Sequence, residues 1–372
     1  MIKAFDYQKD IKKDKKFFLL SFQRVLNSGN LILGKEVEKF EKNFSKFIGT
    51  KYGVGVGNCT DAIYISLKAL NIGPGDEVIT VANTAIPTIT AIVNSGAKPK
   101  FADIGKDYLM EPKNITKLIT KNTKAIIPVH LYGQTCNMEE IIKIAKKFKI
   151  KIIEDCAQST GSRYQKKISG SFGDMGCFSF YPTKVLGGFG DGGFITTNNK
   201  NLYKKIRNLR YMGIETNKDS KQTYKNLYYA YQQGTNSRLD EIQAAMLNIK
   251  LNKIKVSIKK RQINAERYYK NLNETNLILP QKNSKKFDVF YEFIVRHKNR
   301  NKIIKILKKK GINLKITYPF PIYKMKPYKI YGSKFLLKNT EKFSKEIFSL
   351  PVYPGITDKQ ITKICNEIKK II

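Results

Sequence analysis

Short apolar segments alternate with amphipathic stretches along the first two-thirds of the chain. Apolar residues cluster at Glu77–Val81, Pro99–Ala102 and Ala125–Val129, and runs of this length are typical of buried strands. Longer stretches between and after them, such as Met138–Phe148, place apolar residues at helical spacing. Because buried parallel strands must be covered on both faces by helices, the alternation predicts an α/β fold with a mostly parallel sheet.

The same reasoning extends to the rest of the chain. Residues 200–231 are polar and rich in tyrosine, which predicts a long loop with a helix at its start. From about residue 255 helices again alternate with strands, so we expect a large domain over residues 1–250 and a smaller C-terminal α/β domain over residues 251–372. The further predicted elements are helices at 7–27, Leu33–Phe47, Ala62–Leu70, Asn83–Asn94 and Glu241–Ile258, and strands at Val54–Val56, Ile152–Glu154, Gly176–Tyr181 and Val289–Val295.

The stretch from Lys151 to Thr197 carries the most distinctive chemistry. An apolar strand ends in the carboxylate pair Glu154–Asp155, and a second strand is followed by Lys184 and then by a run of glycines. A lysine held in an apolar setting is suited to Schiff-base chemistry, because burial favours its neutral form. Functional groups of such sheets gather at the carboxyl ends of the strands, and Asp61, His130, Asp155 and Lys184 all follow predicted strand ends.

A second candidate site begins the helix after the first predicted strand. Asn58-Cys-Thr-Asp61 is typical of a helix start, where free backbone N–H groups can bind a phosphate. The segment matches neither a dinucleotide-binding nor a Walker motif. Taken alone, the pattern also fits an ordinary helix cap, so it leaves both possibilities open.

Composition narrows the classes of function. The chain has 69 Lys and Arg against 30 Asp and Glu, a formal net charge of +39. Its lysines are spread along the whole sequence without a nucleic-acid-binding motif, which favours lysine as a generic surface residue and argues against nucleic acid as the partner. A small anionic substrate fits the charge equally well. Five cysteines without a C-x-x-C pair and two histidines predict neither a disulfide framework nor a metal centre. The N-terminus has no apolar signal and no run approaches a membrane span, so we expect a cytoplasmic protein without a membrane partner.

Taken together, the motifs resemble the DegT/DnrJ-type family of sugar aminotransferases, which are pyridoxal-phosphate (PLP) enzymes of fold type I. The resemblance covers nearly the whole chain. It implies a large PLP-binding domain with a mostly parallel, mixed sheet and a smaller C-terminal domain. The motifs that carry it are Gly57-Asn-Cys-Thr-Asp-Ala62, Gly73-Pro-Gly-Asp-Glu-Val78, Asn83-Thr-Ala-Ile-Pro-Thr88, Pro128-Val-His-Leu-Tyr-Gly133, Glu154-Asp-Cys-Ala-Gln158, Phe178-Ser-Phe-Tyr-Pro-Thr-Lys184, Gly190-Asp-Gly-Gly193, Asn236-Ser-Arg-Leu-Asp-Glu241 and Leu350-Pro-Val-Tyr-Pro354.

The resemblance implies a role for each matching residue. Lys184 is the lysine that binds PLP covalently and moves the proton, Asp155 pairs with the pyridine nitrogen, and Gln158 reaches the ring hydroxyl. The cofactor phosphate is expected at the backbone of Thr60 and Asp61, with help from the Ser179 hydroxyl. Asn236 matches a residue that reaches the phosphate from a partner subunit, which implies a homodimer with shared active sites. His130 is expected to have a structural or pocket-lining role rather than to act as an acid or base, because Lys184 already supplies the base.

The implied substrate is a nucleotide-linked keto-deoxy-hexose, with glutamate as the amino donor. Local resemblance favours C3 of a dTDP-3-keto-6-deoxyhexose, with Tyr181 and Tyr318 placing the sugar. Ala85 stands where many relatives place an aromatic residue over the PLP ring, so that stacking contact is expected to be absent or replaced. Thr317 and Tyr323 depart from residues common in the substrate loop of the family, which bears on the sugar contacts. Amination at C4 is the alternative. A sugar dehydratase of the same fold would carry histidine at the position of Lys184, and a DNA-binding or regulatory protein would not need the Lys184–Asp155 pair.

Overall fold

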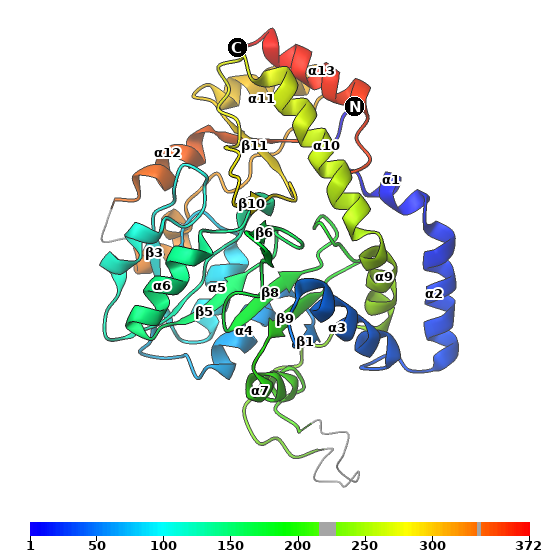
Figure 1. Ribbon diagram of the computed structural model, residues 1–372, viewed down its shortest axis with the longest axis vertical. Coiled ribbons are helices and arrows are strands. Elements are labelled where there is room, and N and C mark those ends of the chain that lie inside the picture. Colours follow the sequence, from blue (N-terminus) through cyan, green and yellow to red (C-terminus); the bar gives the residue numbers. More distant parts are fainter. Residues whose placement is uncertain (216–227, 333–335) are drawn as a thin grey trace.

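A seven-stranded sheet runs through the centre of the computed structural model, which describes residues 1–215, 228–332 and 336–372 (Figure 1). β9 is antiparallel to both of its neighbours, and every other neighbouring pair is parallel. The predicted mostly parallel sheet is therefore confirmed. Its strands, in spatial order, are β1 (Tyr52–Val56), β9 (Gly193–Thr197), β8 (Met175–Ser179), β5 (Lys151–Asp155), β4 (Thr123–Ile126), β2 (Glu77–Val81) and β3 (Lys98–Ala102).

Helices cover both faces of this sheet, because neighbouring residues of a strand point to opposite sides. Val78 and Ile153 pack in one hydrophobic cluster with α4 (Cys59–Ala69), α5 (Ile86–Asn94) and α7 (Lys200–Arg210). Phe178 and Phe194 pack on the other side with α3 (Lys35–Ile48) and α9 (Glu241–Asn252), while α6 (Met138–Phe148) covers β4 and β5. The result is a three-layer α/β/α arrangement.

The C-terminal part builds a separate hydrophobic cluster. Its members come from α10 (Ile254–Leu272), α11 (Arg300–Lys309), α13 (Asp358–Lys369) and the antiparallel pair β11 (Phe293–Arg296) and β12 (Ile347–Leu350). Ile2 joins this cluster and pairs with Ile312, so the two chain ends lie on the same part of the molecule (Figure 1). α10 contributes residues to both this cluster and the one around α9. The domain division at residue 250 stays a prediction.

Shorter elements complete the structure. The shorter elements are α1 (Tyr7–Lys12), α2 (Lys15–Ser28) and α12 (Lys338–Glu346), the small sheet of β6 (Arg163–Tyr164), β7 (Lys167–Ile168) and β10 (Lys286–Phe287), and 3-10 turns at Pro112–Asn114, Thr116–Leu118, Leu131–Gly133, Ile322–Lys324 and Lys326–Tyr331. No helix in the described ranges is long and apolar enough to cross a bilayer.

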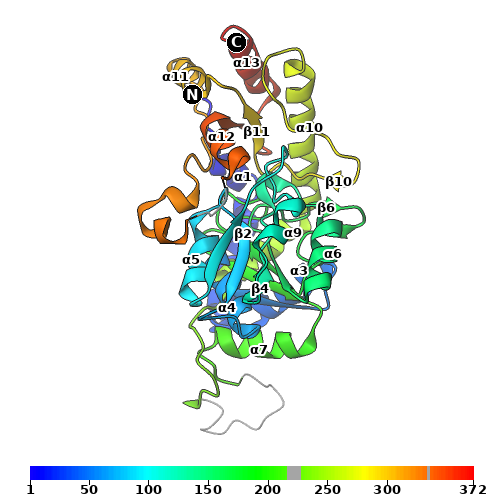
Figure 2. The same ribbon diagram turned by 90° about the vertical axis from the view of Figure 1, so that its left-hand side faces the viewer.

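Four elements differ from the sequence prediction. The helix expected at 7–27 is split into α1 and α2, and the one expected at Glu241–Ile258 breaks at Lys253, whose backbone is not helical. β9 was not predicted, because a run of glycines leads directly into this short buried strand. The strand expected at Val289–Val295 begins only at Phe293. Residues 289–292 instead bond to Tyr132 and Gly133. Figure 2 shows β10 and β11, the strands on either side of this segment in the sequence. The predicted loop over 200–231 lies partly outside the described residues.

Candidate active site

Lys184 lies in a turn that follows β8. Its backbone N–H donates to the Tyr181 carbonyl at 2.9 Å, and its side chain is half-buried. The Nζ atom lies 4.9 Å from the centre of the Tyr291 ring, a position typical of a cation–π contact. The lysine side chain is therefore directed against the segment that precedes β11.

Asp155 is the last residue of β5, and its side chain is only 4% exposed. One carboxylate oxygen accepts a hydrogen bond from the Thr88 hydroxyl at 2.7 Å, and the other accepts from the Ala157 N–H at 3.1 Å. Because the Thr88 proton is used in this way, the Thr84 hydroxyl donates to Thr88 at 3.0 Å. Two threonines and a backbone N–H thus orient the carboxylate.

Electrostatics favour a cation beside Asp155. Burial raises the pKa of Asp155 above its usual value, while the Thr88 and Ala157 hydrogen bonds and the positive charge of Lys184 act in the opposite direction. A buried carboxylate is stabilised in its ionised form by a positively charged partner. A protonated ring nitrogen would supply such a partner.

Gln158 and Tyr318 are brought together although they lie 160 positions apart. The Gln158 amide accepts from the Tyr132 N–H at 2.8 Å and donates to the Tyr318 hydroxyl at 2.6 Å. Tyr318 has a positive φ of 56°, a backbone conformation that is uncommon for residues other than glycine and often marks functional sites. The predicted cofactor residue and the predicted substrate residue therefore share one hydrogen-bond network.

The start of α4 is the predicted phosphate site. The Asn58 side chain caps the helix by accepting from the Asp61 N–H at 2.9 Å, and the Asp61 carboxylate accepts from Ser237 at 2.6 Å. The N–H groups of Cys59 and Thr60 belong to the first turn and have no partner within the helix. An anion here would bind the Thr60 N–H directly and would reach the Asp61 N–H only by displacing the Asn58 oxygen.

The helix start lies close to the other two groups. Burial is the main cause that raises the pKa of the Cys59 thiol, and Asp155 and Lys184 both act on it electrostatically. Gly193 at the start of β9 faces Asn58 so closely that a Cβ atom would come within 2.3 Å of the Asn58 backbone. The carboxyl ends of β1, β5 and β8 thus bring Thr60, Asp155 and Lys184 to one region.

The remaining predicted residues are placed as follows. Ser179 ends β8, is 8% exposed, and its hydroxyl accepts from the Tyr181 N–H at 3.3 Å. Tyr181 is half exposed. Asn236 is exposed, and its backbone pairs with Tyr211. Its neighbour Ser237 is buried and donates to the Asp61 carboxylate, whereas Asn236 itself is exposed.

The residues that depart from the family pattern have structural partners. The Thr317 hydroxyl donates to Glu292 at 2.6 Å, and the Tyr323 hydroxyl donates to Glu341 at 2.6 Å. Ala85 precedes α5 as its cap residue.

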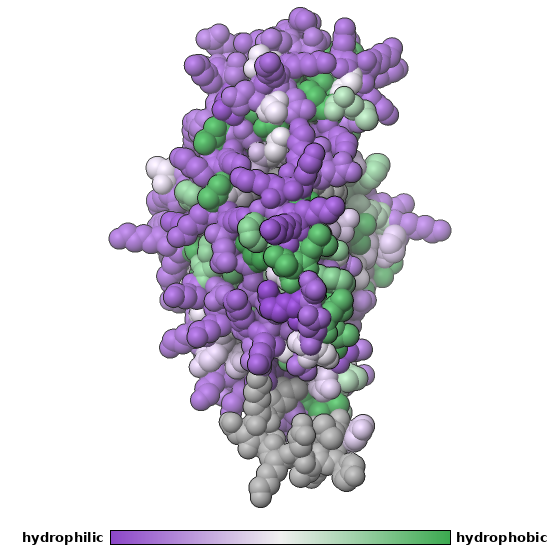
Figure 3. Space-filling model, turned by 90° about the vertical axis from the view of Figure 1, so that its right-hand side faces the viewer, coloured by the Kyte–Doolittle hydropathy of each residue, from purple (hydrophilic) through white to green (hydrophobic). Residues whose placement is uncertain are grey.

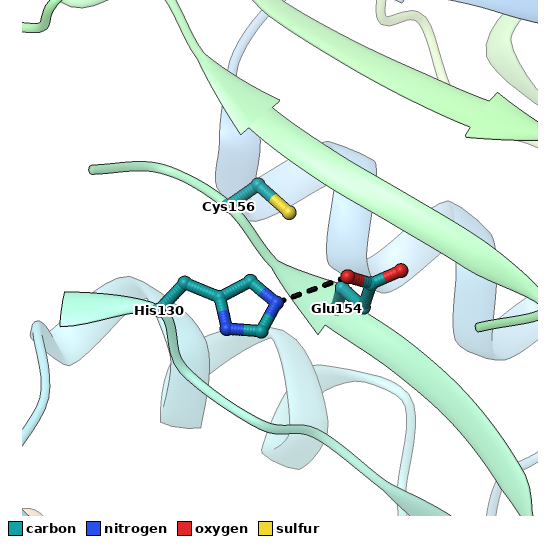
Figure 4. A group of neighbouring side chains, drawn as sticks. All are labelled: His130, Glu154 and Cys156. Atoms are coloured by element: carbon teal, nitrogen blue, oxygen red, sulfur yellow. Dashed lines mark hydrogen bonds and ion pairs between the residues drawn. The ribbon is translucent and has the colours of Figure 1, made fainter. Parts of the chain in front are cut away.

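His130 forms a fully buried cluster with Glu154 and Cys156 (Figure 4). Their ligand-type atoms lie within 4.8 Å of one another, a spacing that could suit a metal. The Glu154 carboxylate already accepts from His130 at 3.0 Å and from the N–H groups of Gly170, Phe172 and Gly173 at 2.7–2.8 Å. His130 Nδ1 accepts from the Cys136 N–H at 3.1 Å, so the ring hydrogen is on Nε2. The cluster satisfies itself without a cation.

Sequence reasoning missed several residues of this region. It gave no role to Thr88, Ser237, Tyr132 or Tyr291, although the first three lie within quoted motifs. The contacts of Ser237 and Tyr291 join residues more than 100 positions apart, and no local pattern could have revealed them.

Comparison with known proteins identifies the relatives of this arrangement. The sequence pattern of the DegT/DnrJ/EryC1/StrS aminotransferase family matches residues 12–369. A dTDP-3-amino-3,4,6-trideoxy-alpha-D-glucose transaminase from Micromonospora megalomicea subsp. nigra is 38% identical, over 99% of this chain and 98% of the relative. A dTDP-3-amino-3,6-dideoxy-alpha-D-galactopyranose transaminase from Aneurinibacillus thermoaerophilus is 40% identical, over 98% of this chain and 96% of the relative. The crystal structure of S. venezuelae DesV, in complex with a ketimine intermediate, superposes with a TM-score of 0.93 at 32% identity. The match covers 100% of this chain and 98% of that chain.

Proposed function

The chain belongs to the DegT/DnrJ/EryC1/StrS aminotransferase family, and within it we propose that the enzyme transfers an amino group from glutamate to C3 of a dTDP-linked 3-keto-6-deoxyhexose. The observation that carries the C3 assignment is that two relatives, aligned over nearly their whole length, are named as transaminases of 3-amino sugars. The presence of Lys184 beside Asp155 supports transamination over the dehydratase and non-enzymatic alternatives.

The cofactor of this enzyme is PLP. When bound, PLP supplies a carbonyl carbon that takes up and releases amino groups and a ring that accepts electrons. The residues described above fit PLP for two reasons. The ionised form of the buried Asp155 carboxylate is stabilised by a cation such as the protonated ring nitrogen. The backbone N–H groups at the start of α4 can bind the phosphate. In our proposal Asp155 pairs with the ring nitrogen, Gln158 reaches the ring hydroxyl, and Thr60, Asp61 and Ser179 hold the phosphate.

Lys184 is proposed to bind the cofactor and then to carry the proton. Once an amino donor has displaced it, the Nζ amine is a base that can take a proton from one carbon and return it to another. Its contact with the Tyr291 ring suits both the protonated and the neutral form of the amine. The ring face attracts the ammonium form, and it does not occupy the lone pair of the neutral form with a hydrogen bond.

A basic cavity adjoins Lys184 and supports an anionic substrate. The cavity measures about 760 Å³ and lies between the N-terminal helices and the α9–α10 junction. Its lining contains Lys9, Lys13, Lys253 and Lys260, of which Lys253 is ion-paired with Asp14 at 2.6 Å. A nucleotide diphosphate carries charge of the opposite sign, so this surface would favour its capture.

The position of amination can be tested with two substrates. Purified enzyme is offered dTDP-3-keto-6-deoxyhexose and dTDP-4-keto-6-deoxyhexose separately, with glutamate, and the new C–N bond is located by NMR. We expect amination of the 3-keto sugar, because the pocket must place one carbon against the cofactor and a shift of about 1 Å already lowers the rate by about 100-fold. Amination of the 4-keto sugar alone would overturn the C3 assignment and leave the family assignment intact.

The exposed apolar face of α2 supports the proposed homodimer. Phe17, Leu19, Leu20, Phe22 and Leu26 are each 40–57% exposed. Hydrophobic side chains gather across the middle of the side of the molecule that carries α2 (Figure 3). A large exposed apolar patch on a protein surface marks a site of interaction with another surface. In the proposed dimer, Asn236 of each chain reaches the cofactor phosphate of its partner.

Shared sites predict complementation between two inactive variants. Lys184→Ala and Asn236→Ala are expected to be inactive as homodimers. After mixing and subunit exchange, one of the two sites in a heterodimer carries both native residues, so up to about a quarter of the wild-type activity should return when half of the dimers are mixed. Sedimentation measures the oligomeric state in parallel. A monomer at micromolar concentration would contradict the proposal, as would heterodimers that stay inactive.

A further inference from the structure

Tyr291 makes two separate contacts with the turn that carries Lys184. Its ring lies 4.9 Å from the Lys184 Nζ atom, and its hydroxyl lies 3.1 Å from the Thr183 hydroxyl. The Tyr291 residue is only 8% exposed. A single side chain from outside the sheet thus touches both the lysine and the residue before it.

The backbone around Tyr291 is fixed from several sides. The guanidinium of Arg261, which is 2% exposed, donates to the carbonyls of Phe290 and Tyr291 at 3.2 and 3.3 Å. Val289 donates to the Gly133 carbonyl at 2.9 Å. A Cβ atom on Gly133 would come within 2.5 Å of the Tyr291 nitrogen, so the two backbones are in direct contact.

This anchoring explains why residues 289–292 do not continue as a strand. Phe290 has a φ of 49°, which turns the chain away from the β11 ladder and toward the loop at Tyr132. Tyr132 in turn donates to Gln158. The segment therefore connects the Gln158 network with the turn that bears Lys184.

From these contacts we infer that Tyr291 is a positioning residue for Lys184. The ring face supports the lysine side chain, and the hydroxyl fixes Thr183, so that Nζ stays beside Asp155 when the lysine is free of the cofactor. This inference rests on the proposed role of Lys184 as the cofactor-binding residue. It assigns no chemistry to Tyr291 itself.

The test measures how fast cofactor-free enzyme takes up PLP, followed by the visible absorbance of the bound cofactor. Tyr291→Leu removes ring and hydroxyl, and its uptake rate should fall by about 10-fold or more. Tyr291→Phe keeps the ring and should lose only about 5-fold. With the keto sugar, kcat should fall in the same order while KM is unchanged. Tyr268→Phe, which removes a buried hydroxyl that donates to Pro351, serves as the control and should behave as wild type.

A double-mutant cycle tests the contact with Thr183 directly. Thr183→Val alone should slow uptake about as much as Tyr291→Phe, and the combined variant should be no slower than either single variant. The inference would be overturned if the combined variant slowed PLP uptake by the product of the two single decreases. A folded Tyr291→Leu protein whose uptake rate is within about 2-fold of wild type would also overturn it. If Tyr291→Leu does not fold, the cycle decides, since its members retain the ring.

The proposed function can fail separately. Lys184→Ala should lose every borohydride-stable adduct with PLP. If it does, while the Tyr291 variants take up PLP as wild type does, only the positioning role is wrong. If Lys184→Ala keeps the adduct, the role of Lys184 is wrong.

Discussion

Lys184→Ala is expected to lower the transamination rate by about 10⁴-fold or more while the protein stays folded. The variant removes both the amine that binds the cofactor and the base that moves the proton. The fold should survive, because the side chain is half-buried and its Nζ atom contacts the face of the Tyr291 ring. Single-turnover kinetics with glutamate measure the loss, and borohydride reduction followed by mass spectrometry shows whether PLP is attached.

A lysine far from the site provides the matched control. Lys204 is exposed on α7, and Lys204→Ala removes the same charge from a protein that already carries a formal net charge of +39. It should retain full activity and the PLP adduct. A Lys184→Ala enzyme that still turned over at the wild-type rate would remove the basis of the proposed mechanism.

The positions of the reactive residues could be predicted because they follow strand ends. Asp155 ends β5, Lys184 follows β8, and the start of α4 follows β1. A periodic pattern in a short segment is sufficient to place each of them at the same edge of a parallel sheet. The family resemblance then supplied the expected roles, and membership of the family is confirmed.

What could not be predicted depends on contacts between distant segments. β9 lies between β1 and β8 because Gly193 allows close packing against Asn58 and Phe194 packs in the aromatic cluster of α3. Tyr291 leaves its expected strand because Arg261 and Gly133 hold its backbone elsewhere. Local propensity contains no information about either partner, so tertiary contacts decided both outcomes.

Glu154→Gln is expected to destabilise the protein by about 3 kcal/mol, although the change replaces only one oxygen by an NH₂ group. The buried carboxylate accepts four hydrogen bonds, two on each oxygen. In the variant the new amide hydrogens must face two of these donors. If the NH₂ group takes the Oε2 position, it meets the Gly170 N–H and the His130 Nε2–H.

His130 cannot relieve the clash between its Nε2–H and the new amide group by moving its ring hydrogen. Its Nδ1 atom accepts from the Cys136 N–H, so a shift of the hydrogen from Nε2 to Nδ1 would only place two donors together there. If the amide is flipped, its NH₂ group instead faces the N–H groups of Phe172 and Gly173. Either orientation leaves buried donors without acceptors, which is why a nearly isosteric change should have a large effect.

Chemical denaturation of the purified variants measures this effect. Glu140→Gln makes the same substitution at an exposed position in the first turn of α6 and should change the free energy of unfolding by about 0.5 kcal/mol or less. Glu154→Ala should be at least as destabilised as Glu154→Gln, since it leaves all four donors unpaired. A Glu154→Gln protein as stable as the Glu140→Gln control would show that the cluster in Figure 4 does not hold the loop at 170–173 in place.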